Sequence, residues 1–205
     1  MKKLFVTGIG TEIGKTVSAA ILTEALQADY WKPVQSGSET DSDAGTVKSL
    51  ISNTSSVFHP ESYLLKAPLS PHAAAELENI TIDPNQIHLP ETDNHLVIEG
   101  AGGLFVPLNN NYLIVDLIQQ LQAEVVVVSK NYLGSINHTL LTIEALNARQ
   151  IPIAGIIFNG DKNNQTEDLI LRYTGLRPLL HISPEATLTP AVVQKYAALV
   201  KPNLI

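Results

Sequence analysis

Short apolar runs alternate along the chain with stretches whose apolar residues recur at helical spacing. The run at 125–128 is four consecutive valines, a composition typical of a strand covered on both faces. The predicted strands are residues 4–7, 30–32, 95–99, 124–129 and 151–158, and the predicted helices are residues 17–26, 112–121 and 136–148.

Strands that alternate with helices predict an α/β fold with a mostly parallel sheet and helices on both faces. Ligands in such sheets sit at the carboxyl ends of the strands. Residues 79–92 are polar and contain Pro84 and Pro90, so we expect a surface excursion there. The sequence shows no internal repeat, and residues 1–205 are predicted to form a single domain.

Composition and charge exclude several kinds of chemistry. The chain has no Cys, which excludes disulfides, thiolate metal sites and a cysteine nucleophile. Its 13 basic and 20 acidic residues give a net charge of -7 without a dense basic run, so no nucleic-acid partner is expected. No apolar window is long enough for a membrane span and the first residues do not resemble a signal peptide, so we expect no membrane partner and a cytoplasmic location.

The strongest motif is a phosphate-binding loop with the sequence Gly8-Ile9-Gly10-Thr11-Glu12-Ile13-Gly14-Lys15-Thr16. It follows a predicted strand and opens a predicted helix, which is the context that such a loop requires. Its backbone N–H groups and the helix N-terminus favour a bound anion. Lys15 would meet the β- and γ-phosphates, and the Thr16 hydroxyl would bind Mg²⁺. The weaker alternative is a strand-to-helix turn without a ligand.

The spacing of this loop departs from the usual pattern. Five residues separate Gly8 from Gly14, where four are usual, and Ile9 stands at the standard position of the first glycine. We expect Gly10 to supply the flexibility instead.

Further polar residues follow the ends of other predicted strands. Lys32 comes directly before Pro33, and the residues after Pro33 are turn formers; the lysine either meets the same nucleotide or faces solvent before a turn. Glu99 precedes three glycines in four residues, where P-loop enzymes carry a magnesium-organising acid; the alternative is a solvated strand end. Asp41 and Asp43 are each open to either metal binding or helix capping.

Together and in this order, these motifs resemble the dethiobiotin synthetase family. The matching segments are residues 8–16, 32–37 and 99–103; residues 70–72 and 133–138 also resemble family segments. The five-residue gap in the phosphate loop is the family's own form. The resemblance implies a P-loop NTPase-like fold and a ligase that uses ATP and Mg²⁺ to join CO₂ to 7,8-diaminononanoate. Closure of the ureido ring then gives dethiobiotin, in biotin biosynthesis.

The resemblance also implies roles for individual residues. Lys15 and Lys32 would flank the transferring phosphoryl group and a substrate carbamate, and Thr11 would approach the γ-phosphate. Thr16, Asp43 and Glu99 would hold Mg²⁺, with Asp41 as the alternative to Asp43. The nucleotide would be bound by a larger set, namely Glu12, Ile13, Gly14, Lys15, Thr16, Val17, Asp43, Glu99, Gly100, Ala101, Gly102, Asn159, Ser183 and Pro184.

The substrate would be bound from two sides. The resemblance places Ser36 and Glu12 near the diamine and implies a homodimer with the substrate site at its interface. The segment containing Leu133, Gly134 and Asn137 leaves the valine-rich strand and opens a helix, so its free amides are suited to a carboxylate. The alternative is that this turn only connects strand to helix.

Two histidines, His72 and His138, are interpreted without a catalytic role. His72 follows Ser70 and Pro71, which favours a helix start over a general base, and His138 is expected to be a packed or interface residue.

Another P-loop amide-forming or carboxylating ligase would use the same motifs. A ParA- or MinD-like switch ATPase is less favoured, because residues 8–13 contain no additional lysine.

Overall fold

The central element is a parallel sheet. A computed structural model describes residues 1–37 and 42–204, and seven strands pair in the order β11-β10-β9-β1-β6-β2-β4. Their bounds are β1 Lys3–Gly8, β2 Asp29–Trp31, β4 Phe58–His59, β6 Leu96–Gly103, β9 Glu124–Lys130, β10 Ile153–Asn159 and β11 Pro178–Ile182. Every pairing in this sheet is parallel, which confirms the predicted architecture.

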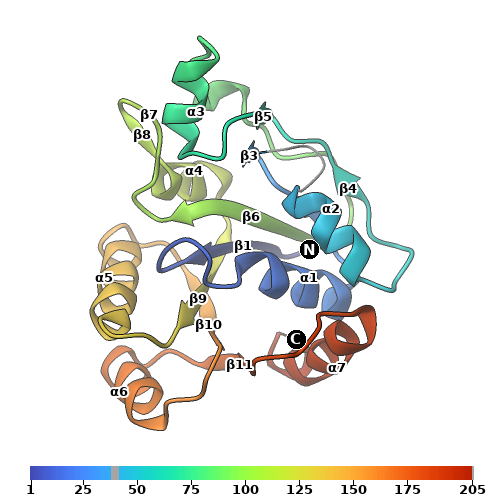
Figure 1. The fold of residues 1–205 in the computed structure, drawn as a ribbon, viewed down its shortest axis with the longest axis vertical. Helices are drawn as coiled ribbons and strands as arrows, with labels where there is room; N and C mark the ends of the chain where they lie inside the picture. The colour runs from blue at the N-terminus through green and yellow to red at the C-terminus, as the bar shows by residue number, and fades with distance from the viewer. Residues whose placement is uncertain (38–41, 205) are drawn as a thin grey trace.

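Helices cover both faces of the sheet, as expected (Figure 1). One face carries α4 (Ile114–Leu121), α5 (Ser135–Ala148) and α6 (Asn164–Thr174), and the other carries α1 (Lys15–Leu26), α2 (Asp43–Leu50) and α7 (Pro190–Val200). Successive strand residues point to opposite faces of the sheet. Phe5 therefore packs in the core beneath α4, α5 and α6, while Leu4 and Val6 pack in the core beneath α1, α2 and α7. The sheet is therefore buried on both sides.

The peripheral elements are short. Helix α3 spans Pro71–Leu77, and two 3₁₀ turns, η2 and η3, span Pro84–Gln86 and Lys201–Asn203. Strand β3 (Val34–Ser36) pairs with β5 (Tyr63–Leu65), and β7 (Pro107–Asn109) pairs with β8 (Tyr112–Leu113).

Most predicted elements are confirmed, with shifted ends and one error. Helix α1 begins at Lys15, β6 continues through its glycines, and the helix predicted from residue 112 begins at Ile114. The turn predicted directly after Pro33 is wrong, because Val34–Ser36 form a strand. The excursion at 79–92 lies outside the sheet, although its Ile82 is buried.

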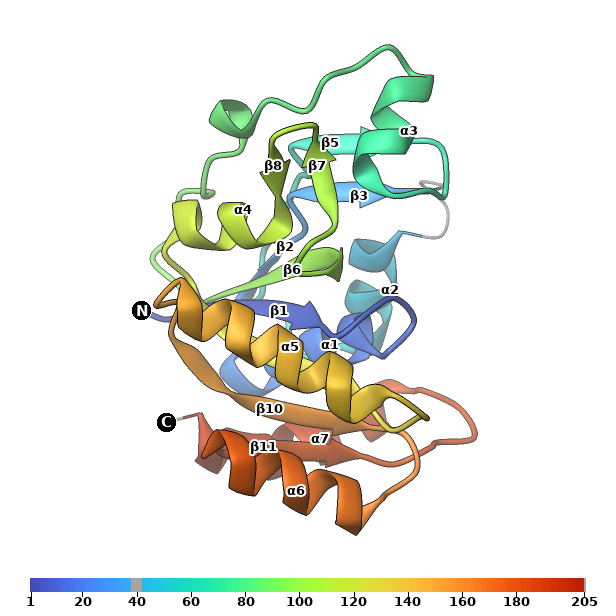
Figure 2. The same cartoon turned by 90° about the vertical axis from the view of Figure 1, so that its left-hand side faces the viewer.

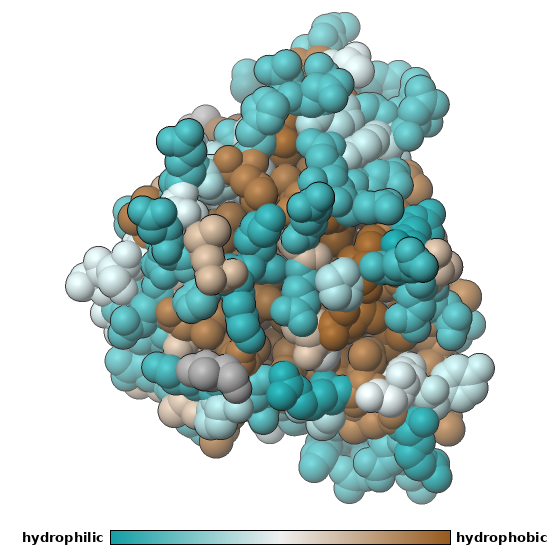
Figure 3. All heavy atoms as spheres, turned by 180° about the vertical axis from the view of Figure 1, so that it is seen from behind, coloured by the Kyte–Doolittle hydropathy of each residue, from teal (hydrophilic) through white to brown (hydrophobic). Residues whose placement is uncertain are grey.

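The strands point toward one edge of the molecule, which carries the phosphate loop (Figure 2). Both termini lie at the opposite edge (Figure 2). Seen from that edge, apolar residues occupy the middle of the face and hydrophilic residues surround them (Figure 3). Among the described helices, none has the length and apolar character needed to cross a membrane. Because the strands end at the edge that carries the phosphate loop, the candidate active site is expected there.

Candidate active site

The phosphate loop joins β1 to α1 and is held by two glycines. Gly14 is the N-cap of α1, with a left-handed φ of 94°. A Cβ at Gly14 would lie 2.3 Å from Asn159 Nδ2, which donates a hydrogen bond to the Ile13 carbonyl at 2.9 Å. A Cβ at Gly8 would lie 2.3 Å from the Ile13 side chain. The loop thus needs glycine where it touches Asn159 and where Ile13 folds back over Gly8.

The expectation that Gly10 supplies the loop's flexibility is wrong. Gly10 does not have a positive φ, and a Cβ there would have no neighbour within 4 Å. Its carbonyl instead accepts a hydrogen bond from Lys15 Nζ at 2.9 Å. Glu12, by contrast, adopts the left-handed conformation, with φ 56°.

Substitutions at Gly14 and Gly10 should therefore differ in their effect on stability. We expect Gly14→Ala to lower the free energy of unfolding by about 1–3 kcal/mol, because alanine resists the left-handed conformation and displaces Asn159. Gly10→Ala is the matched control and should leave this free energy almost unchanged. Urea unfolding followed by circular dichroism measures both, and equal losses in the two variants would contradict the account.

Two carboxylates converge on one hydroxyl. Thr16 Oγ1 lies 2.7 Å from Asp43 Oδ1 and 2.8 Å from Glu99 Oε1. A hydroxyl has one proton, so it donates to only one of these oxygens at a time. Both separations are close to the spacing of neighbouring ligands around Mg²⁺, about 2.9 Å for metal–oxygen bonds of 2.0–2.1 Å. These two separations suit a small, hard cation, whose remaining coordination positions phosphate oxygens and water would fill.

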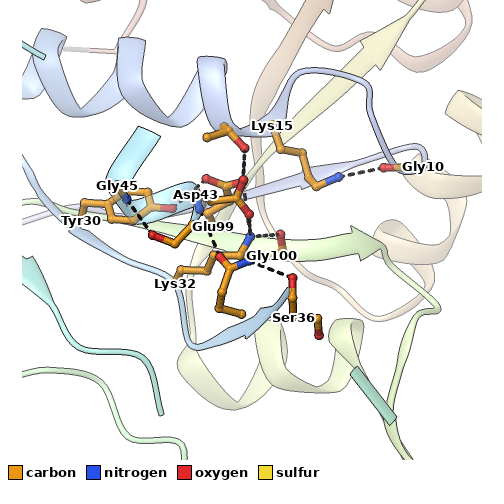
Figure 4. Close-up of polar contacts among 12 residues, drawn as sticks. Gly10, Lys15, Tyr30, Lys32, Ser36, Asp43, Gly45, Glu99 and Gly100 are labelled. Atoms are coloured by element: carbon orange, nitrogen blue, oxygen red, sulfur yellow. Dashed lines mark hydrogen bonds and ion pairs between the residues drawn. The ribbon is translucent and has the colours of Figure 1, made fainter. Parts of the chain in front are cut away.

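Lys32 is the cation within this group (Figure 4). Its side chain is 4% exposed, and Nζ lies 2.5 Å from Asp43 Oδ2 and 3.5 Å from Glu99 Oε1. Burial alone would lower the pKa of Lys32, but Glu99 and Asp43 together raise it, so the lysine is charged. Burial likewise opposes ionisation of Asp43, yet Lys32 lowers the pKa of that carboxyl. Burial lowers the pKa of Lys15.

These side chains open into one cavity of about 840 Å³. Most of the predicted site residues line it: Thr11, Glu12, Gly14, Lys15, Thr16, Val17, Lys32, Ser36, Asp43, Glu99, Ala101, Gly102 and Asn159. Two predicted residues are not part of the lining. Ile13 of the phosphate loop is buried, and Gly100 lies next to the site, with its carbonyl 3.5 Å from Lys32 Nζ. Ser36 Oγ is buried and has no hydrogen-bond partner in the described part of the chain.

Several cavity residues were not predicted. Gln35 accepts a hydrogen bond from the Asp43 backbone N–H at 3.2 Å and so fixes the start of α2. Residues 68–71 and Val106 form further parts of the lining. Gln35 lies within the motif at 32–37, but its sequence position gave no indication of its contact with α2.

The predicted caps need two corrections. Ser42, rather than Asp43, caps α2 by accepting a hydrogen bond from the Gly45 N–H at 3.1 Å, and Asp43 is the first helical residue. Asp41 lies outside the described residues. Helix α3 does start at Pro71 after Ser70, but the Ser70 hydroxyl contacts His72 Nδ1 at 3.1 Å instead of capping the helix.

The remaining predicted residues lie away from the cavity. Leu133, Gly134 and Asn137 line a separate cavity of about 850 Å³ at the starts of α5 and α6. His138 lies in α5, where it contacts the Tyr132 hydroxyl at 2.8 Å. Ser183 and Pro184 are exposed directly after β11 and line neither cavity.

Comparisons with known proteins agree with this site. An AAA domain family model matches residues 2–192. The chain is 54% identical over 198 residues to the ATP-dependent dethiobiotin synthetase BioD of Cytophaga hutchinsonii, covering 96% of each chain. It is 51% identical to the synthetase of the same name from Christiangramia forsetii, covering 96% of this chain and 94% of the relative.

Two solved structures resemble the fold at low sequence identity. A ParA family ATPase from Chlorobium tepidum has a TM-score of 0.57 and 15% identity, covering 100% of this chain and 95% of that one. A putative plasmid partition protein from Borrelia burgdorferi, bound to AMPPNP, has a TM-score of 0.62 and 13% identity, covering 98% and 97%. At this identity the likeness concerns the fold alone.

Proposed function

Because the chain belongs to the ATP-dependent dethiobiotin synthetase family, we propose that it carboxylates 7,8-diaminononanoate with CO₂ and ATP and closes the ring of dethiobiotin. The observation that carries the proposal is the meeting of Lys15, Lys32 and two carboxylates at one cavity in a chain 54% identical to such a synthetase. The reaction belongs to biotin biosynthesis, and ADP and phosphate leave.

The chemistry needs positioning and charge neutralisation rather than a protein nucleophile. One amine of the substrate captures CO₂, loses a proton and becomes a carbamate. A carbamate oxygen attacks the γ-phosphorus and ADP leaves; the second amine then attacks the carbonyl carbon and phosphate leaves. Lys15 neutralises the phosphoryl oxygens and Lys32 lies where it can face the carbamate, while Thr11, Glu12 and Ser36 line the space for the amines.

The remaining cavity residues are proposed to bind the nucleotide. The amides of the phosphate loop and the start of α1 hold the phosphates. Asn159 reads the base through its Oδ1 and its second Nδ2 hydrogen, while the first Nδ2 hydrogen is donated to the Ile13 carbonyl. Ser183 and Pro184 follow β11, which is the neighbour of the strand that ends at Asn159, and they pass beside the base.

The direct test is the product. Purified protein is incubated with the diamine, ¹³C-bicarbonate, ATP and Mg²⁺, and mass spectrometry follows a species heavier than the diamine by one labelled carbonyl less two hydrogens. Other diamines and amino acids serve as competing substrates. ADP release with one of those compounds, and none with 7,8-diaminononanoate, would show a different carboxylating or amide-forming ligase.

We also propose that Thr16, Asp43 and Glu99 hold the Mg²⁺ that accompanies ATP. The metal supplies charge neutralisation and orientation for the β- and γ-phosphates when it is bound. The support is the convergence of the two carboxylates on the Thr16 hydroxyl at 2.7 and 2.8 Å. Lys32 neutralises the charge of the same carboxylates.

Removing the charge of either carboxylate should weaken Mg²⁺ binding. We expect Glu99→Gln to raise the Mg²⁺ concentration for half-maximal activity by at least about tenfold, because a hard cation prefers an anionic oxygen. Asp43→Asn should act in the same direction. Asp41→Asn is the control and should have much less effect; if it is the more damaging change, Asp41 is the ligand and the assignment of Asp43 is wrong.

We propose further that the working unit is a homodimer with a shared substrate site. The substrate's carboxylate lies at the far end of an alkyl chain from its amines. Leu133, Gly134 and Asn137 line a cavity separate from the phosphate loop, and the Leu133 side chain is fully exposed. A second copy that brings this cavity to the first cavity's mouth would bind the carboxylate at the start of α5.

Mixing two inactive variants tests the shared site. Lys15→Ala subunits keep Asn137, and Asn137→Ala subunits keep Lys15, so each mixed dimer contains one complete site. Random mixing should restore roughly one quarter of the wild-type sites. Activity is measured after unfolding and refolding the mixture, with each variant refolded alone as the control. Full wild-type activity from a monomer at assay concentration excludes the proposal.

A further inference from the structure

The two oxygens of Glu99 face different surroundings. Oε1 faces the cavity side, 2.8 Å from Thr16 Oγ1 and 3.5 Å from Lys32 Nζ. Oε2 accepts a hydrogen bond from the Tyr30 hydroxyl at 2.8 Å (Figure 4). Glu99 is 1% exposed and Tyr30 is 0% exposed, so protein groups rather than bulk water set the orientation of this carboxylate.

Tyr30 itself is held rigidly. It lies in β2, where it pairs with Val97 of β6 on one side and Phe58 of β4 on the other. Its ring is also in contact with the Phe58 ring, with centroids 5.4 Å apart. A carboxylate only accepts hydrogen bonds, so the phenol is the donor. The hydroxyl is therefore a fixed donor aimed at Oε2.

We propose that Tyr30 is a positioning residue for the metal-binding carboxylate, and that its hydroxyl holds Oε2 so that Oε1 stays directed at Thr16 and Lys32. This inference rests on the magnesium site proposed above for Thr16, Asp43 and Glu99. Tyr30 and Lys32 stand two residues apart and contact the two different oxygens of Glu99. Partners that orient a metal ligand in this way typically change metal affinity by about 10- to 100-fold when they are lost.

The test is Tyr30→Phe, which keeps the ring and removes only the hydroxyl. ATP binding is measured by calorimetry without the diamine, over a series of Mg²⁺ concentrations and again in EDTA. We expect the Mg²⁺ concentration for half-maximal tightening of ATP binding to rise about tenfold, while the ATP affinity in EDTA is unchanged. A purely structural role would instead change ATP affinity equally with and without the metal.

Tyr63→Phe is the matched control. The Tyr63 hydroxyl contacts the backbone of Asp83, outside the cavity, so its loss should leave the Mg²⁺ dependence as in the wild type. Circular dichroism verifies that both variants are folded. Tyr30→Phe with wild-type Mg²⁺ dependence would overturn the proposal.

A double variant shows whether Tyr30 acts through Glu99. In a Glu99→Gln background, Tyr30→Phe should cause no further rise in the required Mg²⁺, because the carboxylate that it orients is gone. A second rise of equal size would also overturn the proposal. These measurements need neither the diamine nor turnover, so they stand apart from the product assay: failure to make dethiobiotin leaves the Tyr30 result unaffected, and the reverse also holds.

Discussion

Lys15→Ala should lower kcat by about 10³-fold, the effect expected from removing a cation that stabilises charge on the transferring phosphoryl group. In the structure Lys15 lies against the phosphate loop and donates a hydrogen bond to the Gly10 carbonyl at 2.9 Å. That bond is the one described contact that the ammonium group makes within the loop, so its loss should disturb the fold little. The ammonium group has three N–H donors, so it can keep this bond and still meet the phosphates, whereas alanine offers the phosphates no cation at all.

The rate is measured as product formed under saturating ATP and Mg²⁺, with circular dichroism and thermal unfolding as checks of the fold. Lys66→Ala is the matched control, because it removes the same charge from an exposed position outside the cavity. We expect wild-type turnover from this control. A folded Lys15→Ala protein with wild-type turnover would refute the assignment of the phosphate loop.

Lys32→Met should lower kcat by about 10²- to 10³-fold and also destabilise the protein. Methionine keeps most of the side-chain length and removes the charge that faces Asp43 Oδ2 at 2.5 Å and Glu99 Oε1 at 3.5 Å. Two carboxylates then share a largely buried site without their cation. We expect the free energy of unfolding to fall by about 2–4 kcal/mol without Mg²⁺, and to recover in part when Mg²⁺ and ADP are added.

The pH dependence of this loss has a definite sign. Lys32 lowers the pKa of Asp43 in the folded protein, so Asp43 contributes stability above its ordinary value of 3.8 and loses that contribution as the pH falls below it. In Lys32→Met this contribution is absent. The difference in stability between wild type and variant should therefore narrow between neutral pH and about pH 3. Urea unfolding over this range measures it, and a difference that widens on acidification would contradict the ion pair.

The sequence predicts the long central strands well and the short peripheral strands poorly. The strand at 124–129 can be recognised from the sequence because a sheet buried on both faces requires continuous apolar residues. Strands β3 and β5 have three residues each and are defined by pairing between distant segments, which leaves no local periodicity to detect. The turn expected after Pro33 failed for this reason.

The same contrast holds for the site. Lys15, Lys32 and Glu99 could be placed together because the carboxyl ends of parallel strands share one edge of the sheet. Tyr30 reads as an ordinary core residue, since nothing local reveals that its hydroxyl reaches a carboxylate 69 residues away. Gly10 was misjudged because the need for glycine depends on contacts made in the folded loop, with Asn159 at Gly14 and with Ile13 at Gly8.

In the comparisons with known proteins, a shared fold does not imply a shared function. A ParA family ATPase shares the architecture at 15% identity, so the architecture by itself does not distinguish a nucleotide switch from a ligase. The relatives that are 51% and 54% identical are synthetases, and they decide between the two functions where the fold does not.

The position of β6 between β1 and β2 has a consequence for biosynthesis of the chain on the ribosome. Lys15 and Lys32 emerge early, but the strand that separates β1 from β2 and carries Glu99 follows much later, as the pairing of Asp29 with Leu96 shows. A nascent chain that ends before residue 96 lacks the strand that lies between β1 and β2, and it lacks Glu99. The proposed Mg²⁺ site includes Glu99, so it forms only after β6 is inserted between strands that precede it in sequence.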